Sequence, residues 1–211
     1  MQLLLLHLLL VAVGLLLRVS AAHRCDCSGI EFSSKEYFCG DHRLGPQKLS
    51  TTHHLVPLLY GYQRLGGLCP AEFLQKWYND STYSYVEPPA DGWQLSTAQN
   101  PIADDQVLYP GMLVDWFGQP EEQFSLFPAG TPFAMRAIPP YILNTPTYGD
   151  IAPFNYHVYK VAYPFVVTSG PRAAFYGQIG QGTIYRTRIT VAMLMQGGFL
   201  TRVKGRIDDF V

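Results

Sequence analysis

The stretch YHVYKVAYPFVVT, residues 156–168, indicates the fold class of this chain. Its side chains alternate with a period of two from Tyr156 to Val161, and they alternate again from Phe165 to Thr168. Pro164 separates the two runs. Alternation over four to eight residues is typical of a strand with one buried face. The stretch therefore predicts two short strands.

Further short elements are expected on both sides. Pro70 stands at the start of a helical pattern whose apolar residues are three and four apart, and this pattern runs to Trp77. The other expected elements are strands at Met112–Phe117, Thr183–Arg188 and Phe199–Arg206, a helix at Thr190–Gln196, and a partly helical stretch at Ala134–Leu143. Several short strands with few helices predict an α+β fold with a small, twisted antiparallel sheet at its core.

The chain divides into three parts. Residues 1–22 predict a cleaved secretory signal, because an apolar run from Leu3 to Leu17 ends at the small residues Ser20, Ala21 and Ala22. Residues 23–104 are loop-rich, and the irregular connection Glu87–Pro110 follows their one helical pattern. Residues 105–211 form the predicted sheet domain. We expect a secreted protein, extracellular or at the cell surface.

The charge of the mature chain argues against nucleic-acid binding. Removal of the signal also removes Arg18, which leaves 14 basic and 16 acidic residues. A nucleic-acid binder needs a concentrated basic face, which is missing here. No second apolar run is long enough to span a bilayer, so we expect no membrane association after signal cleavage.

Four cysteines, Cys25, Cys27, Cys39 and Cys69, lie in the first third of the chain. In an oxidising compartment they predict two disulfides that pin the loop-rich region. A bond between Cys25 and Cys27 would close a very small ring, so each is expected to reach Cys39 or Cys69. A zinc site is the alternative, but the paired spacing of zinc knuckles is absent. Asn79, in the sequon Asn79-Asp80-Ser81, is a predicted glycosylation site.

Five ordered blocks carry a family resemblance. They are DWFG (115–118), FPAGTPFAMRAIPP (127–140), YHVYKV (156–161), GQIGQGTIY (177–185) and GGFLTRV (197–203). The chain resembles the TNT domain, named after the tuberculosis necrotizing toxin, and its secreted fungal NAD glycohydrolase relatives. The resemblance implies hydrolysis of NAD⁺ or NADP⁺ to nicotinamide and an ADP-ribose product, with no cofactor. Whether the chain forms a homodimer stays open.

The resemblance also implies roles for single residues. Arg136 is expected to donate to the substrate diphosphate, with a salt bridge at a helix end as the alternative. Phe117 and Phe124 are expected to sandwich the nicotinamide ring, although core packing would explain Phe117 nearly as well. Tyr185 is taken as a further substrate contact, and His157 as a structural residue.

Two positions depart from the family pattern. Trp116 replaces an arginine of the family's DRFG motif, and Ile184 replaces a glutamine thought to be essential for turnover. Isoleucine cannot form a hydrogen bond with a ribose hydroxyl or a water molecule. Gln181 or Gln178 is the candidate to supply the lost amide. These departures favour the alternative function, a secreted or surface relative that binds nucleotide without turnover.

The C-terminal residues Asp208 and Asp209 raise the possibility of a calcium site, as is thought to exist in some fungal relatives. Carboxylates are suitable ligands, but calcium takes about 6–8 oxygens. A solvated acidic tail is the alternative reading.

Overall fold

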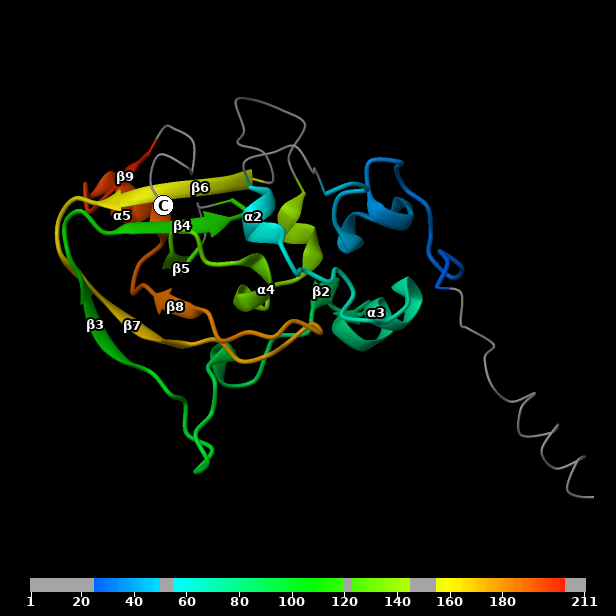
Figure 1. Ribbon diagram of the computed structural model, residues 1–211, viewed down its shortest axis with the longest axis horizontal. Helices are drawn as coiled ribbons and strands as arrows, with labels where there is room; N and C mark the ends of the chain where they lie inside the picture. The colour runs from blue at the N-terminus through cyan, green and yellow to red at the C-terminus, as the bar shows by residue number, and fades with distance from the viewer. Residues whose placement is uncertain (1–24, 50–54, 120–122, 145–154, 204–211) are drawn as a thin grey trace, which may run out of the picture.

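A seven-stranded antiparallel sheet lies at the centre of the computed structural model, which describes residues 25–49, 55–119, 123–144 and 155–203. The spatial order of its strands is β3-β7-β8-β5-β4-β6-β9, and every neighbouring pair is antiparallel. The sheet is strongly twisted (Figure 1). The strands are β3 (Asp104–Leu108), β4 (Leu113–Phe117), β5 (Ser125–Pro128), β6 (Tyr156–Val161), β7 (Phe165–Pro171), β8 (Thr183–Arg186) and β9 (Leu200–Arg202).

The predicted fold class is confirmed, because short helices surround this sheet. They are α2 (Val56–Leu59), α3 (Pro70–Trp77), α4 (Phe133–Arg136) and α5 (Val191–Gln196), with 3-10 turns η1 (Phe38–Gly40), η2 (His42–Leu44), η3 (Ala90–Gly92) and η4 (Pro140–Leu143). A two-stranded hairpin of β1 (Tyr78–Asn79) and β2 (Ser84–Tyr85) follows α3. Among the described residues, no helix has the length and apolarity needed to cross a membrane.

Strand β4 separates two apolar clusters, because its side chains alternate between the faces of the sheet. Val114 and Trp116 pack with residues of β5, β8 and α5. Phe117 faces the other way and packs with residues of α2 and α4. Figure 1 shows α2 and α4 beside the strands, and α5 near β9 at the far end of the sheet.

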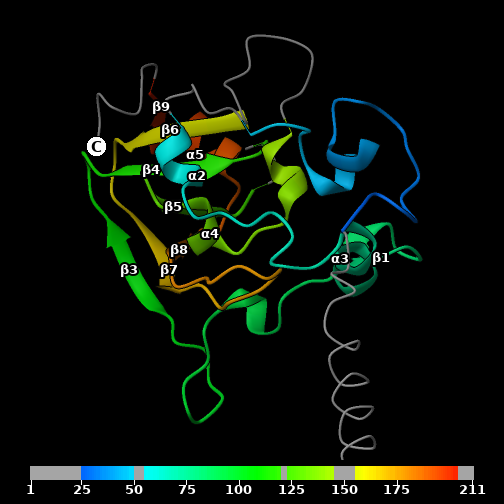
Figure 2. The same cartoon turned by 45° about the vertical axis from the view of Figure 1, so that its right-hand side comes forward.

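The N-terminal region lies at the opposite end of the sheet from α5 and β9 (Figures 1 and 2). Disulfides join Cys25 to Cys69 and Cys27 to Cys39, so the predicted pair of bridges is confirmed. A third apolar cluster attaches this region to the rest of the chain, because Tyr176 packs among Leu44, Phe73, Leu74 and Tyr85.

Glycines permit a close backbone contact between the same two parts. A Cβ atom added to Gly177, whose φ is +71°, would lie 2.6 Å from Cα of Gly66. Only glycine can occupy both sides of such a contact. In the same stretch, the backbone N–H of Gly182 donates to the carbonyl of Met135 (3.0 Å). Gly177 and Gly182 therefore hold neighbouring segments of the chain close together.

Candidate active site

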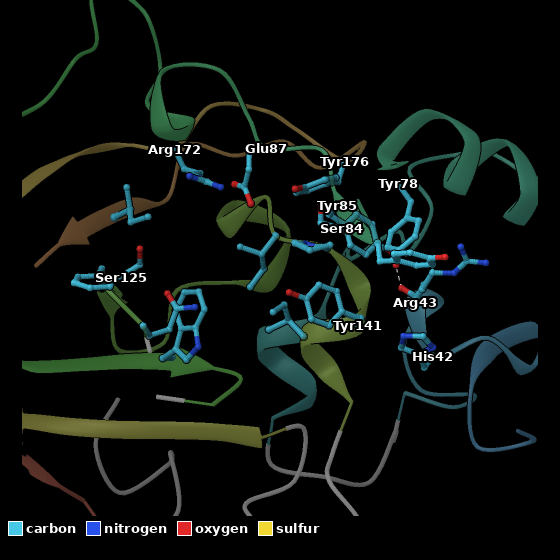
Figure 3. Close-up of a pocket in the computed structure, with 18 of the residues that line it drawn as sticks. His42, Arg43, Tyr78, Ser84, Tyr85, Glu87, Ser125, Tyr141, Arg172 and Tyr176 are labelled. Atoms are coloured by element: carbon cyan, nitrogen blue, oxygen red, sulfur yellow. Dashed lines mark hydrogen bonds between the residues drawn. The ribbon is translucent and has the colours of Figure 1, made fainter. Parts of the chain in front are cut away.

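A cavity of about 540 Å³ lies between the N-terminal region and the sheet (Figure 3). Its lining comes from segments far apart in the sequence. Residues from η2 to Glu87 line one part, β4, the start of β5 and the Ile138–Ile142 segment line another, and residues 172–186 line the rest. The N-terminal region therefore forms part of the wall of the cavity.

Three residues predicted from the family resemblance meet in this cavity. Trp116 on β4, Phe124 before β5 and Ile184 on β8 all line it. Trp116 and Ile184 are buried, each with 4% of its surface exposed, whereas Phe124 is 44% exposed. Ile138 and Ile142 lie in the same lining. This end of the cavity is therefore apolar and suited to packing against an aromatic ring.

A pair of arginines lines the cavity beside this apolar end. Arg172 Nη1 and Arg186 Nη2 both donate to the carbonyl of Asp91, at 3.0 and 3.1 Å. Within the described part of the chain, no carboxylate forms an ion pair with either. Burial lowers the pKa of Arg172, and the neighbouring charge of Arg186 lowers it further. Two neighbouring positive charges that form no ion pair within the described residues favour binding of an anion.

Glu87 is the acidic residue of the cavity. It carries the one carboxylate among the described lining residues, and it lies beside Arg172 and Tyr176 in Figure 3. Burial raises the pKa of Tyr176 and of Tyr141, and the charge of Glu87 is the next cause in both cases. An anion and a cation therefore stand next to each other at the middle of the cavity.

Tyrosines dominate the remaining end. Tyr85 and Tyr141 stack with ring centroids 5.4 Å apart, and Tyr176 meets Tyr85 edge-on at 5.6 Å. The Arg43 guanidinium lies 4.7 Å from the centre of the Tyr78 ring and pairs with Asp41 at 2.6 Å. Tyr85 and Tyr176 are buried, whereas Tyr141 is 41% exposed and offers an aromatic surface of the kind on which a base can stack.

Arg136 does not reach the cavity. Its side chain is 0% exposed and pairs with the buried carboxylate of Asp115, with Nη1–Oδ1 at 2.5 Å and Nη2–Oδ2 at 2.8 Å. Its Nε and Nη2 also donate to the carbonyl of Thr131. The salt bridge is thus interior and not at the surface. A direct contact with diphosphate stays a prediction, and this geometry does not support it.

Arg136 and the residues packed around it contact a residue of the cavity lining. The carbonyl of Arg136 accepts from Arg172 Nε at 3.2 Å, so the buried arginine backbone positions the cavity arginine. Phe117 packs against Phe133 and Tyr156 and lies 4.9 Å below the Arg136 guanidinium. Phe117 is 0% exposed, so the core-packing alternative describes its place.

The other predicted site residues also lie outside the lining. Gln178 is buried and donates to the carbonyl of Gln63 at 2.6 Å, and Gln181 is exposed with a φ of +70°. Tyr185 faces away from Ile184 along β8 and is buried in the core that contains Val191. Whether either glutamine replaces the missing amide stays a prediction without support from this geometry.

The remaining predicted residues are placed as follows. Asn79 is exposed in the β1–β2 hairpin, where glycosylation stays a prediction. Asp208 and Asp209 lie outside the described residues, as does the predicted signal at 1–22. No group of three metal-ligating side chains gathers in the part of the chain that the structure describes. The calcium site therefore stays a prediction.

Sequence reasoning missed Glu87, Arg172 and the tyrosines, because none of them belongs to a recognisable motif. Of the cavity residues that were not predicted, Arg186 is the one that the sequence pattern could have indicated. It shares a strand face with Ile184, two residues before it, and both side chains do line the cavity.

Comparison with known sequences places these observations in a family. The family described as tuberculosis necrotizing toxin matches residues 107–203. The conidial surface nicotinamide adenine dinucleotide glycohydrolase nadA of Aspergillus fumigatus is 43% identical over 179 residues, which cover 84% of this chain and 75% of that protein.

Solved structures give looser likenesses. The tuberculosis necrotizing toxin in complex with its immunity factor has 19% identity and a TM-score of 0.44, covering 56% of this chain and 62% of that one. Rhs1-CT, solved with its immunity protein, has 15% identity and a TM-score of 0.32, covering 56% and 84%.

Proposed function

The chain belongs to the tuberculosis necrotizing toxin (TNT) family, and we propose that it is a secreted or cell-surface NAD glycohydrolase. The reaction splits the bond between nicotinamide and ribose and releases ADP-ribose. The observation that carries the proposal is the meeting of Trp116, Phe124 and Ile184 in one cavity. Trp116 and Ile184 come from two family motifs, Phe124 was expected from the family resemblance, and the three line one space of suitable size for a nucleotide.

The chemistry fits a site with few acids. Nicotinamide is already a cationic leaving group in NAD⁺, so no general acid is required to protonate it. The site must hold the diphosphate and stabilise the positive charge that develops on the ribose. Paired carboxylates, as ordinary glycosidases use, are therefore unnecessary.

The cavity suggests how NAD⁺ is oriented. The nicotinamide ring occupies the apolar end beside Trp116, Phe124 and Ile184. The diphosphate lies against Arg172 and Arg186, whose charges have no carboxylate partner among the described residues. The adenosine then extends toward Tyr85 and its neighbours, where the base stacks on an aromatic surface.

A second candidate function is nucleotide binding without turnover. Trp116 and Ile184 favour it, because two apolar side chains line the cavity where the family has an arginine and a glutamine. The family relationship favours the enzyme over this candidate.

The deciding experiment incubates purified, disulfide-bonded protein with NAD⁺ and, in parallel, with NADP⁺, and measures free nicotinamide by chromatography. Arg186→Met serves as a preparation control, because a contaminating hydrolase would be indifferent to it. We expect nicotinamide release that is weakened in the variant. Binding of NAD⁺ in calorimetry without any release would establish the second candidate instead.

A further inference from the structure

Glu87 comes from a part of the chain that lies outside the segment matched by the family. That segment is 107–203, whereas Glu87 lies between β2 and η3. The residue nevertheless lines the cavity with Trp116 and Ile184. A functional group at this place is therefore a contribution of the N-terminal region.

The carboxylate of Glu87 is free to act. No hydrogen bond or ion pair within the described residues engages it, although Arg172 stands beside it (Figure 3). Its charge acts on Arg172, Tyr141 and Tyr176, which belong to separate segments that surround the cavity. Because the Glu87 carboxylate acts on all three of these residues, it lies at the cavity that they line together.

The charges of the cavity match those of the reacting substrate. In NAD⁺ the ribose that carries nicotinamide becomes cationic during the reaction. One CH₂–O link joins this ribose to the anionic diphosphate, so the two groups are close together. Adjacent protein charges of opposite sign, Arg172 and Glu87, offer the complementary arrangement. The arginine suits the diphosphate, and the carboxylate suits the ribosyl cation.

We propose that Glu87 is a catalytic residue that stabilises the ribosyl cation and accepts the proton of the attacking water. The C1′–N bond breaks with its electron pair going to the nicotinamide nitrogen, so neutral nicotinamide leaves. The water oxygen adds to C1′, one water proton passes to the Glu87 carboxylate, and that proton returns to solvent as ADP-ribose departs. No oxidant, reductant or further reactant is needed.

This assignment explains how the chain works without a glutamine at position 184. Ile184 cannot position water, and neither Gln178 nor Gln181 lines the cavity. The Glu87 carboxylate can position water, because it accepts hydrogen bonds, and it can also stabilise the ribosyl cation, because it carries a negative charge.

The test measures initial rates of wild type, Glu87→Gln, Glu87→Asp and Glu36→Gln over a range of NAD⁺ concentrations, which gives kcat and KM for each. Glutamine keeps the shape and the acceptor oxygen but removes the charge. We expect kcat to fall about 10²–10³-fold in Glu87→Gln with KM changed less than about threefold, because the interaction forms in the transition state. Glu87→Asp retracts the charge by one methylene and should lie between the two. Glu36, exposed and outside the lining, is the matched control and should leave kcat unchanged.

The inference rests on the proposed function, and the outcomes separate the two. If wild type hydrolyses NAD⁺ and Glu87→Gln matches its kcat within twofold, the role of Glu87 is overturned while the glycohydrolase stands. A raised KM at unchanged kcat would make Glu87 a binding residue only, which also overturns the inference. If folded wild-type protein releases no nicotinamide, the proposed function itself fails. Thermal melting of each variant checks that it is folded.

Discussion

A single buried arginine, Arg136, lies next to a pair of arginines at the cavity, Arg172 and Arg186, and the surroundings of the two places differ. Arg136 is enclosed, with its donors on Asp115 and on the Thr131 carbonyl. Arg172 and Arg186 stand at the cavity, where they share one carbonyl and lack a carboxylate partner in the described residues. The buried charge of Arg136 is paired inside the fold, whereas the two cavity arginines donate to carbonyl groups and form no ion pair among the described residues, so they can bind an anion. The contrast supports a structural role for Arg136 and is consistent with the proposed binding role of Arg172 and Arg186.

Removal of the enclosed arginine should give the largest effect on stability. Arg136→Met leaves the buried carboxylate of Asp115 without its partner, which should lower the free energy of unfolding by about 3–5 kcal/mol. Urea unfolding followed by circular dichroism measures this. At a temperature where the variant stays folded, we expect its KM for NAD⁺ to remain within about threefold of wild type.

Arg188→Met is the matched control for that variant. Arg188 pairs with Asp105 at 2.9 Å, but both side chains are exposed, so its loss should cost less than about 1 kcal/mol. The structural role of Arg136 would be contradicted if Arg136→Met strongly weakened NAD⁺ binding while its unfolding midpoint stayed at the wild-type value. Arg136 would then contact the diphosphate.

A buried histidine beside a further arginine, Arg202, gives a second test of how burial affects charge in this fold. Arg202 Nη2 donates to His157 Nδ1 at 2.6 Å, and His157 Nε2–H donates to Asn155 Oδ1 at 2.7 Å, so the ring is neutral. Burial, followed by the charge of Arg202, lowers the pKa of His157 from 6.5 to about 4. The unfolded chain therefore takes up a proton more readily than the folded chain between these pH values.

Stability should fall as the pH is lowered through this window. The contribution of a neutral His157 is complete above pH 6.5 and is lost progressively toward pH 4, by on the order of 2–3 kcal/mol. Unfolding free energies of wild type and His157→Gln at several pH values isolate the effect. An identical pH dependence in both proteins would show that folding does not shift the pKa of His157.

Loss of one cavity arginine should act on binding and not on stability. Arg186→Met removes a charge-assisted contact with the diphosphate and should raise KM for NAD⁺ about 10-fold, equivalent to about 1.4 kcal/mol. Its melting temperature should stay unchanged or rise slightly, because the repulsion on Arg172 is relieved. Arg188→Met, two residues further along, again serves as the control. A lowered melting temperature with unchanged KM would assign Arg186 a structural role.

Local sequence patterns predicted much of the fold. Strand β6 begins and ends where the alternation of Tyr156–Val161 does, and α3 matches the helical pattern of Pro70–Trp77. Strand β3 was missed because Asp104, Asp105 and Gln106 are polar and exposed at a sheet edge, so no buried face marks them. Strand β5 was missed because its consecutive residues Ser125, Leu126 and Phe127 are all buried, so no two-residue alternation marks it.

The site was predictable only where a motif marks it. Trp116 and Ile184 were found from family blocks and Phe124 from the wider family resemblance, but their roles remain to be tested. Arg172 depends on the carbonyl of Asp91, 81 residues away, and on that of Arg136. Such convergence arises from long-range packing, which no local pattern records. The burial of Arg136 was unforeseeable for the same reason, since its partner Asp115 is 21 residues distant.

The two disulfides have a consequence for the cell that makes this protein. They hold the segments that precede Glu87, and these segments form one side of the cavity. In the thiol-rich cytosol the bridges are reduced, so the newly made chain would lack an ordered side of its site. Hydrolysis would begin only after export, and the producer's own NAD⁺ pool would be spared. Nicotinamide release that persists at full rate in excess reductant would contradict this self-protection.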